Sequence, residues 1–353
     1  MSYSNLSDDL PRYQTSQTYA WNYDHAPDPV CVENPTIPGA WTFCGRLVDS
    51  PLGVPAGPLL NGKWVLYYAS LGFDVLTYKT VRSGARECFP MPNIVPVDAL
   101  QLTGAEASVP MSESVAGSWA VGFGMPSVTP DVWRRDIEWT RSRLAANKVL
   151  SVSVVGSVQP HWTIEELAAD YARCAAWAAG AGADVVEVNF SCPNVSTCDG
   201  QLYQHVNDAA YVASVVKDAI QQVPLIIKVG HVRERAEAEA LVAALEPSAA
   251  SLAMTNTIAV PILGVDGKAM FGGQRRGICG TAIRDASIFQ TQLFGDVVKD
   301  RGSRVKLIGV GGASHWSDVL RYLQAGAEAV HVATAAMLDP LVAIRMRRAA
   351  AES

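Results

Sequence analysis

Short apolar runs and alanine-rich stretches alternate along most of the chain, and this alternation constrains the fold more than any other feature of the sequence. The runs with the length of buried strands are Gly53–Gly57, Val75–Lys79, Ala120–Met125, Val149–Val155, Val185–Asn189, Leu225–Val229, Leu252–Thr255, Lys306–Val310 and Ala329–Val332. The stretches with helical character are Asp131–Asn147, Thr163–Ala181, Asp208–Gln222, Glu234–Leu245, Asp285–Lys299 and Trp316–Ala325. Strand–helix alternation of this kind predicts an α/β fold with a parallel sheet covered by helices.

A closed (β/α)8 TIM barrel fits this pattern, although it uses eight strands and one run is in excess. We place Ala120–Met125 outside the barrel, because about 40 residues without a helical stretch separate it from Val75–Lys79. The segment 81–130 is therefore predicted to be a lid inserted after the second strand, over the mouth of the barrel. An open doubly wound sheet is the alternative, but the Gly-x-Gly-x-x-Gly turn of such folds does not follow the first strand.

The beginning of the chain lacks this rhythm. Residues 1–41 are polar and rich in proline and aromatic residues, so we expect an irregular arm across the domain surface, anchored by side chains such as Tyr19. The segment Thr42–Val48 predicts a hairpin that caps one end of the fold. We expect residues 42–345 to form the barrel domain.

Charge and cysteine content argue against several classes of protein. The formal net charge of -6 gives no electrostatic reason for binding nucleic acid or anionic lipid. No apolar run approaches the roughly 18 residues of a membrane span, and residues 1–9 lack the pattern of a secretion signal, so we expect a cytoplasmic protein. The 7 cysteines include no Cys-x-x-Cys pair and the histidines lack metal-binding spacing, so no metal site is expected.

Most of the apolar runs become polar or glycine-rich at their carboxyl ends, where barrel enzymes carry their chemistry. Lys79 and Lys228 each end an apolar strand, and a charge inside a barrel needs a partner, for example a cofactor that becomes anionic when reduced. Gly309–Ser314 and Val332–Ala335 follow the last two strands and predict a phosphate site. Gly272–Gly280 is expected to be a third glycine-rich loop that completes this site.

The segment after the strand at 185–189 concentrates polar side chains. Cys192 is flanked by Ser191 and Pro193, and Asn189 and Asn194 offer amide groups on either side. A cysteine at a strand end is often a small buried residue, whereas a thiol in a polar mouth can act as a nucleophile or a proton acceptor. The residues alone leave these alternatives open.

Asn189–Asn194 resembles the Asn-x-Ser-Cys-Pro-Asn signature of the class 1 dihydroorotate dehydrogenases and the related barrel domains of dihydropyrimidine dehydrogenase. Other segments of the chain match the family in the same order along the sequence. They are Pro55–Gly57, Ile227–Lys228, Thr255–Thr257 and Gly309–Gly312. The resemblance covers about residues 42 to 340 and leaves the N-terminal arm unmatched.

This resemblance implies a flavin-dependent oxidoreductase that acts on CH–CH bonds with FMN as cofactor. The implied FMN contacts are Ala56, Gly57, Lys79, Asn189 and Lys228 at the isoalloxazine, and Gly277, Gly280, Gly311, Gly312, Ala333 and Thr334 at the phosphate. Thr80 and Ser153, polar residues at strand ends, are further candidates for cofactor binding. Lys228 would stabilise negative charge near N1 of reduced flavin. Cys192 would be the general acid/base while a hydride passes between the substrate and flavin N5.

One loop departs from the family pattern. The family's Leu-Pro-Asn-Asn-Gly loop, which binds orotate, corresponds to Met125–Thr129, where Ser127 stands in place of the asparagine. The expected substrate residues are Lys79, Ser127, Asn189, Asn194, Asn256 and Thr257. The small-molecule substrate is therefore either a related cyclic amide or conjugated carbonyl compound, or dihydroorotate itself in a true class 1 enzyme of pyrimidine biosynthesis.

Two further hypotheses come from other classes of protein. A barrel transferase or hydrolase could use Cys192 as a nucleophile, but neither His231 nor His331 is a convincing partner base for it. A non-catalytic binder of phosphate ligands would leave the two lysines and the thiol without a role.

The resemblance also implies a homodimer. The electron donor or acceptor stays open.

Overall fold

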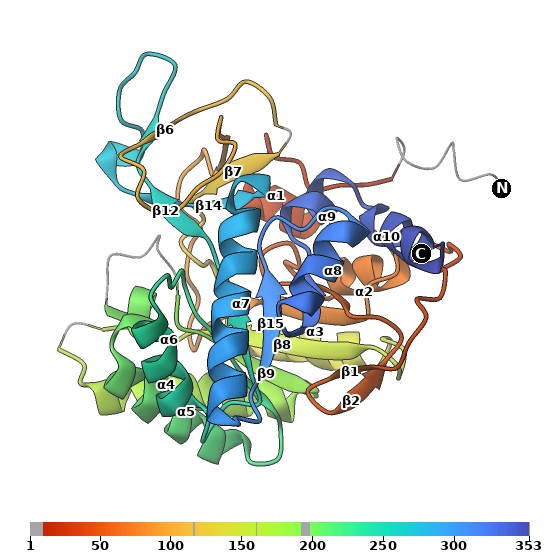
Figure 1. Cartoon of the computed structure of the whole chain (residues 1–353), viewed down its shortest axis with the longest axis vertical. Helices are drawn as coiled ribbons and strands as arrows, with labels where there is room; N and C mark the ends of the chain where they lie inside the picture. The colour runs from red at the N-terminus through yellow and green to blue at the C-terminus, as the bar shows by residue number, and fades with distance from the viewer. Residues whose placement is uncertain (1–9, 116, 160, 192–197, 353) are drawn as a thin grey trace.

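The centre of the molecule is a closed barrel of parallel strands (Figure 1). The computed structural model describes residues 10–115, 117–159, 161–191 and 198–352. In order around the barrel the strands are β3 (Leu52–Val54), β4 (Val75–Val81), β8 (Val149–Val154), β9 (Val185–Asn189), β10 (Leu225–Lys228), β11 (Ser251–Met254), β15 (Lys306–Val310) and β16 (Ala327–His331). β16 closes the barrel by pairing with β3, with Val330 opposite Leu52. The closed barrel is confirmed, and the open doubly wound sheet is ruled out.

Helices cover the outside of the barrel (Figure 1). Those that follow the expected pattern are α3 (Pro130–Arg141), α4 (Ile164–Gly180), α5 (Val206–Ile220), α6 (Arg235–Leu245), α7 (Arg284–Arg301) and α8 (Trp316–Gln324). α4 begins with a capping box, in which Thr163 Oγ1 accepts from the Glu166 amide and the Glu166 carboxylate accepts from the Thr163 amide. The sequence pattern does not indicate α2 (Gly62–Ser70), which is apolar on nearly every side and is almost wholly buried. The short helices α9 (Thr334–Leu338) and α10 (Val342–Ala351) follow the last strand.

A second sheet lies outside the barrel. It has the order β12-β14-β7-β5 and appears above the barrel in Figure 1. Its strands are β5 (Ile94–Pro96), β7 (Ser118–Val121), β12 (Ile258–Val260) and β14 (Arg276–Gly280), and a separate pair joins β6 (Val109–Pro110) to β13 (Ile262–Leu263). The prediction that the run at 120–125 lies outside the barrel is confirmed by β7. The domain boundaries and the lid function of residues 81–130 stay predictions.

The expectation of a loop at Gly272–Gly280 is wrong for most of that segment. Residues from Arg276 onward form β14, which pairs with both β7 and β12. Ile278 is fully buried in the small core of this second sheet, which is why the segment is a strand. Only its end, at Cys279 and Gly280, reaches the barrel mouth described below.

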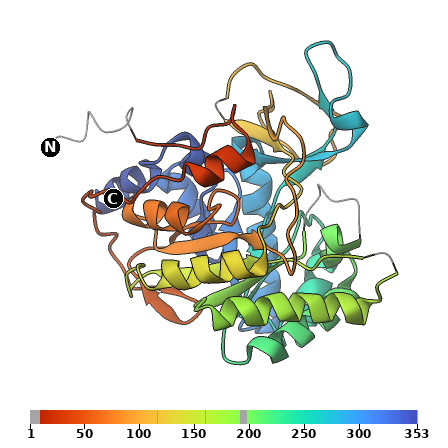
Figure 2. The same cartoon turned by 180° about the vertical axis from the view of Figure 1, so that it is seen from behind.

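The N-terminal arm is more ordered than expected. It contains the helix α1 (Tyr19–Asp24), which begins where Thr18 Oγ1 accepts from the Trp21 amide. The indole of Trp64 in α2 donates to the Asn22 carbonyl at 3.0 Å, and Figure 2 shows α1 lying beside α2. Hydrogen bonds within the arm and between the arm and α2 therefore hold it in place.

The amino-terminal end of the barrel is closed by the expected hairpin. β1 (Trp41–Phe43) pairs with β2 (Arg46–Val48), and Phe43 is fully buried against inward-facing side chains such as Val75 and Val149. Burying one phenylalanine contributes roughly 1.5 to 3 kcal/mol. A ligand therefore reaches the barrel from the opposite end, where the strands finish.

A buried ion network ties α10 to the barrel. Arg347 Nη2 donates to Asp74 Oδ2 at 2.5 Å and to Ser50 Oγ at 3.0 Å, and Lys148 Nζ donates to Asp74 Oδ1 at 2.8 Å. The carboxylate of Asp74 is thus fully paired, as a buried charge requires.

No helix within the described ranges combines the length and the apolar character needed to cross a bilayer.

Candidate active site

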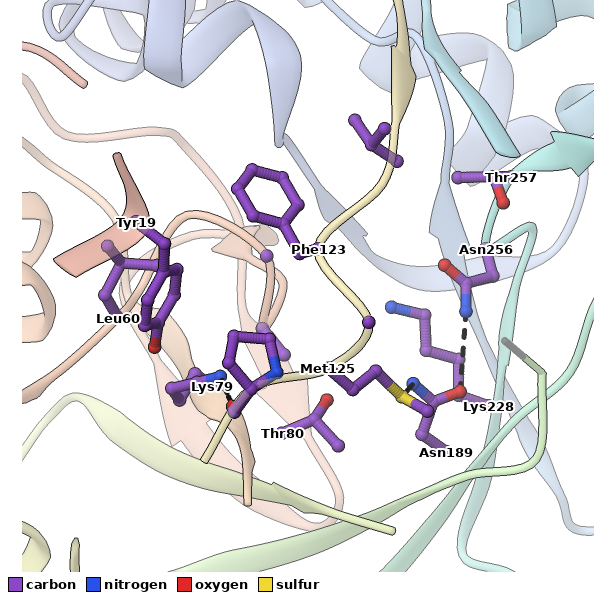
Figure 3. Close-up of a pocket in the computed structure, with 15 residues that line it drawn as sticks. Tyr19, Leu60, Lys79, Thr80, Phe123, Met125, Asn189, Lys228, Asn256 and Thr257 are labelled. Carbon is purple, nitrogen blue, oxygen red and sulfur yellow. Dashed lines mark hydrogen bonds between the residues drawn. The ribbon is translucent and has the colours of Figure 1, made fainter. Parts of the chain in front are cut away.

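A cavity lies at the carboxyl ends of β4, β9 and β10, beside the segment that follows β7 (Figure 3). It is lined by Tyr19, Ala56, Gly57, Leu60, Lys79, Thr80, Val121, Phe123, Gly124, Met125, Pro126, Asn189, Lys228, Asn256 and Thr257. The structure therefore brings together predicted residues from five separate segments of the chain. Both lysines and three of the predicted polar side chains, Asn189, Asn256 and Thr257, are among them.

A second cavity adjoins the first at the ends of β15 and β16. It is lined by Gly117, Asn256, Cys279, Gly280, Thr281, Ile283, Val310, Gly311, Gly312, Ala313, Ser314, Ala333, Thr334, Ala335 and Leu338. Asn256 lines both cavities, so the two meet at this residue. The lysines lie in the first cavity and the glycine-rich loops in the second.

Lys79 is buried at the end of β4, and its surroundings weaken its charge. Its ammonium donates to the Pro126 carbonyl and lies 5.1 Å from the centroid of the Tyr19 ring. Burial lowers the pKa of Lys79 to about 7. Cys88 opposes this lowering, and the positive charge of Arg82 adds a smaller contribution to it. Lys79 can therefore change its protonation state near neutral pH.

Lys228 and two asparagines form the polar side of the first cavity. Figure 3 shows the Lys228 side chain extending into the cavity near Asn189 and Asn256. Asn189 Oδ1 accepts from the Ser191 amide at 3.1 Å and from Asn256 Nδ2 at 3.4 Å, while its own Nδ2 contacts Met125 Sδ at 3.7 Å. Asn256 Nδ2 also donates to the Ser191 carbonyl. The two amides are thus held in place, while Lys228 Nζ has no hydrogen-bond partner among the described residues.

Two glycines that line the second cavity have no room for a side chain. Gly312 has φ +70°, and a Cβ there would lie 2.6 Å from the Gly280 carbonyl oxygen and 2.7 Å from Arg284 Cβ. Gly280 has φ +94°, and a Cβ there would overlap the Gly117 carbonyl. Backbone at these positions can approach an anion closely, which is what a phosphate group needs.

The family model described as dihydroorotate dehydrogenase matches residues 120–350 of this chain. The chain belongs to the dihydroorotate dehydrogenase family. A dihydroorotate dehydrogenase of Dictyostelium discoideum is 34% identical over 327 residues, which is 86% of this chain and 86% of that protein. The catalytic subunit of dihydroorotate dehydrogenase B (NAD(+)) of Desulforudis audaxviator is 29% identical over 307 residues, 85% of this chain and 87% of that protein.

A crystal structure of the dihydroorotate dehydrogenase of Eimeria tenella, in complex with ferulenol, has the same fold. The TM-score is 0.73 at 17% identity, over 93% of this chain and 88% of that chain. As a member of the dihydroorotate dehydrogenase family, the chain is a flavin-dependent oxidoreductase that acts on a carbon–carbon bond.

Three residues expected at the site of this family member do not line either cavity. Ser127 Oγ accepts from the Arg82 amide at 3.1 Å and donates to the Val128 carbonyl at 2.9 Å, so its hydroxyl is used within the loop. Ser153 shares a hydrogen bond of 3.0 Å with Thr80 below the cavity. Gly277 lies inside β14, opposite Val121.

Cys192 and Asn194, the expected acid/base and one of the expected substrate residues, lie outside the described residues. Their roles in this dihydroorotate dehydrogenase family member stay predictions from the sequence.

Several site residues are not indicated by the sequence. Tyr19 comes from the arm and packs edge-on against Phe123 at 6.3 Å, and both line the first cavity. Gln290 of α7 accepts from Thr255 Oγ1 at 2.6 Å and donates to the Gly230 carbonyl at 2.8 Å, which links the ends of β10 and β11. The arm's wealth of aromatic residues is a signal for Tyr19, but no local pattern marks Gln290.

Proposed function

We propose that this chain binds FMN and uses it to oxidise dihydroorotate to orotate. The observation that carries the proposal is the junction of the two cavities at Asn256, because a lysine-bearing cavity that joins a glycine-lined one suits a cofactor with a flat polar ring and a phosphate tail. The family membership supports the same choice of cofactor.

The chain's own residues fit the ring of FMN in the first cavity. Ala56 and Gly57 offer a flat wall of backbone, while Lys79 and Asn189 offer polar atoms at the rim. The Lys228 ammonium would stabilise negative charge at the ring. When bound, FMN supplies the acceptor for a hydride.

The phosphate would lie in the second cavity. The backbone of Gly311 and Gly312 can approach its oxygens, and Thr334 adds a hydroxyl. No arginine or lysine lines this cavity among the described residues, so backbone amides would carry most of the binding.

The substrate would lie against Lys79, Asn256 and Thr257, with Asn194 from the adjoining segment. The thiolate of Cys192 would remove one carbon-bound proton as the hydride leaves the neighbouring carbon, which creates the double bond. No histidine lines either cavity among the described residues, so a cysteine nucleophile of the transferase kind lacks a base.

Dihydroorotate is favoured because the Dictyostelium discoideum relative is named dihydroorotate dehydrogenase. The match between the two proteins covers most of both chains. The second candidate is a related cyclic amide, and the observation that favours it is the engagement of the Ser127 hydroxyl with Arg82 and Val128, away from the cavity. A site that lacks one amide donor would bind the dione of orotate less tightly.

A single anaerobic experiment tests the proposal. The purified protein is loaded with FMN and mixed with dihydroorotate or dihydropyrimidines, while the reduced protein is mixed with orotate or fumarate. Bleaching of the flavin absorbance by dihydroorotate is expected. Bleaching only by another compound would favour the second candidate, and a protein that takes up no FMN would contradict both.

Cys192→Ser separates the role of the thiol from binding. This variant should bind FMN normally but reduce it far more slowly, because a hydroxyl is a poor base near neutral pH. Equal rates for the variant and the native protein would remove the assigned role.

We also propose a cytoplasmic homodimer, on the strength of the class 1 resemblance. Sedimentation of the FMN-loaded protein tests the dimer, and a single species with the mass of one chain would contradict it. Reoxidation by fumarate or NAD⁺ would identify the class of electron acceptor.

A further inference from the structure

The inside of the barrel carries a polar layer below the proposed flavin site. Val75, Val185 and Ala329 belong to the inward-facing apolar cluster, and residues two positions further along each strand face the same way. Those residues are Thr77, Glu187 and His331. They lie on β4, β9 and β16. Together with β11, whose Ala253 also faces inward, these are every second strand around the barrel. The strand register brings these side chains to one level, as in the four-residue layers typical of such barrels.

This layer holds polar atoms that have no partner. Thr77, Glu187 and His331 of this layer, and Ser151 on the intervening strand β8, are each at most 1% exposed. Thr77 Oγ1, Ser151 Oγ, Glu187 Oε1 and both ring nitrogens of His331 find no hydrogen-bond partner among the described residues. Buried polar groups are almost always paired, either with protein or with ordered water. A cluster of this size therefore points to a bound species that pairs with all of them.

Two residues of the same region have little or no side chain. Ala253 contributes only a methyl group to the layer. Gly53 carries no side chain, and a Cβ there would lie 2.7 Å from His331 Nε2, so the imidazole fills the place beside this glycine. The hydroxyl, carboxylate and imidazole groups of this layer are the kinds of partner that ordered water requires.

Lys228 lies directly above this layer. It follows Ile226 by two residues on β10, and the register pairs Ile226 with Glu187 on β9. Glu187 is therefore a diagonal neighbour of Lys228 inside the barrel. Burial lowers the pKa of His331 to about 3, and the positive charge of Lys228 adds to this lowering. The imidazole is neutral, so Glu187 is the acidic side chain that faces the lysine from this layer.

We propose that ordered water fills this layer and joins Glu187 to the ammonium of Lys228, which makes Glu187 a positioning residue for that lysine. The proposal rests on the proposed function for its link to FMN. The carboxylate holds Lys228 at the ring and offsets part of its positive charge. Glu187 thereby sets how strongly the protein favours reduced, negatively charged flavin.

The first test needs no cofactor. Thr77→Val keeps the shape of the side chain and removes one hydroxyl from the layer. If water pairs with that hydroxyl, the free energy of unfolding of the apoprotein falls in urea titration. If the layer is dry, removing an unpaired hydroxyl raises it, and this result would overturn the water-filled layer.

The second test measures the midpoint potential of bound FMN. Glu187→Gln removes the negative charge and should shift the potential to more positive values, because Lys228 then stabilises reduced flavin without opposition. His331→Gln is the matched control, since it alters the same layer without altering its charge, and its potential should match that of the native protein. In a Lys228→Met background the effect of Glu187→Gln should shrink, as expected if it acts through the lysine.

The outcomes separate this proposal from the proposed function. Flavin that binds to Glu187→Gln with an unchanged potential would overturn the positioning role while leaving the FMN site intact. A native protein that binds no FMN would contradict the proposed function, and Thr77→Val would still decide the water layer. If Glu187→Gln does not fold, Glu187→Asp provides the test, with a shift in the same direction, since the shorter side chain moves the charge away from Lys228.

Discussion

The ring of Tyr19 faces the ammonium of Lys79, with 5.1 Å between the nitrogen and the ring centroid. Tyr19 belongs to the N-terminal arm, whereas Lys79 lies near the end of the second barrel strand, β4. The arm therefore contributes an aromatic wall to the first cavity, and Tyr19 also packs against Phe123 from the segment that follows β7. Two segments outside the barrel meet over the mouth at this tyrosine.

Tyr19→Ala is expected to expose the proposed flavin site. Removing the ring opens the wall between the cavity and solvent, so iodide should quench the fluorescence of bound flavin several-fold more effectively. Trp21→Ala is the matched control, because Trp21 lies in the same helix but stacks on His25, with ring centroids 4.1 Å apart. Equal quenching in both variants would show that Tyr19 does not shield the site.

Lys79 predicts a pH dependence of stability. Its pKa falls from 10.5 to about 7 on folding, so between these values the unfolded chain binds a proton that the folded chain lacks. The free energy of unfolding of the apoprotein should therefore gain a contribution as pH rises from 7 to 10, by at most about 5 kcal/mol. Lys79→Met should lose this contribution in urea titrations, while the exposed Lys63→Met should keep it. Identical pH profiles for all three proteins would contradict the lowered pKa.

Lys228→Met tests the stabilisation of charge at the ring. The methionine keeps the length of the side chain but removes the ammonium, so the FMN midpoint potential should become more negative. Loss of one such electrostatic partner typically slows a reaction about 10²-fold, which stopped-flow reduction would measure. Lys299→Met, at the exposed end of α7, is the control and should change neither quantity. A normal potential in Lys228→Met would mean that the ammonium does not contact the ring.

Gly312→Ala should abolish FMN binding. The added Cβ would occupy space 2.6 Å from the Gly280 carbonyl oxygen, inside the glycine-lined cavity. Gly302→Ala is a close control, because Gly302 has a similar φ of +63° but nothing within 4 Å of the added Cβ. Gly302→Ala should lose about 1 kcal/mol of stability from the left-handed backbone, and Gly312→Ala should lose more because its Cβ also meets backbone atoms. Only Gly312→Ala should fail to retain the cofactor in equilibrium dialysis. Retention by both would place the phosphate elsewhere.

Arg347→Met should destabilise the whole barrel. It leaves the Asp74 carboxylate, 1% exposed at its side chain, with Lys148 as its remaining cation. Breaking a buried ion pair typically costs 3 to 5 kcal/mol, and the remaining lysine suggests a loss of about 3 kcal/mol. Chemical denaturation measures the change, with the exposed Arg304→Met as control. A loss below about 1 kcal/mol would show that α10 is not held by this network.

The barrel strands can be predicted from the sequence because each is a buried run with a polar or glycine-rich end. β9 begins and ends at the predicted residues, and β10 and β15 differ by one residue or none. The helices can be predicted for a similar reason, because residues such as the capping pair of α4 mark where a helix begins. Where local sequence and burial agree, the prediction is accurate.

The parts that could not be predicted depend on contacts between distant segments. β14 looks like a glycine-rich loop, and it becomes a strand because β7 and β12 pair with its two edges. α2 has no helical period because its aromatic residues are buried on nearly every side. Tyr19 enters the site only through the path of the arm, which no local pattern specifies. In the same way, the Ser127 hydroxyl is directed away from the cavity by the Arg82 amide, about forty residues earlier in the chain.

The pairing of β16 with β3 has a consequence for how the protein is made. These neighbouring strands lie almost 280 residues apart in the chain, and the glycine-lined cavity includes residues from both sides of the last strand. A growing chain on the ribosome therefore has no complete pocket until nearly all of it has been synthesised, and contacts over such long separations form slowly. Cofactor loading is thus a late event. A chain truncated before β16 would leave the barrel unclosed and the glycine-lined cavity incomplete.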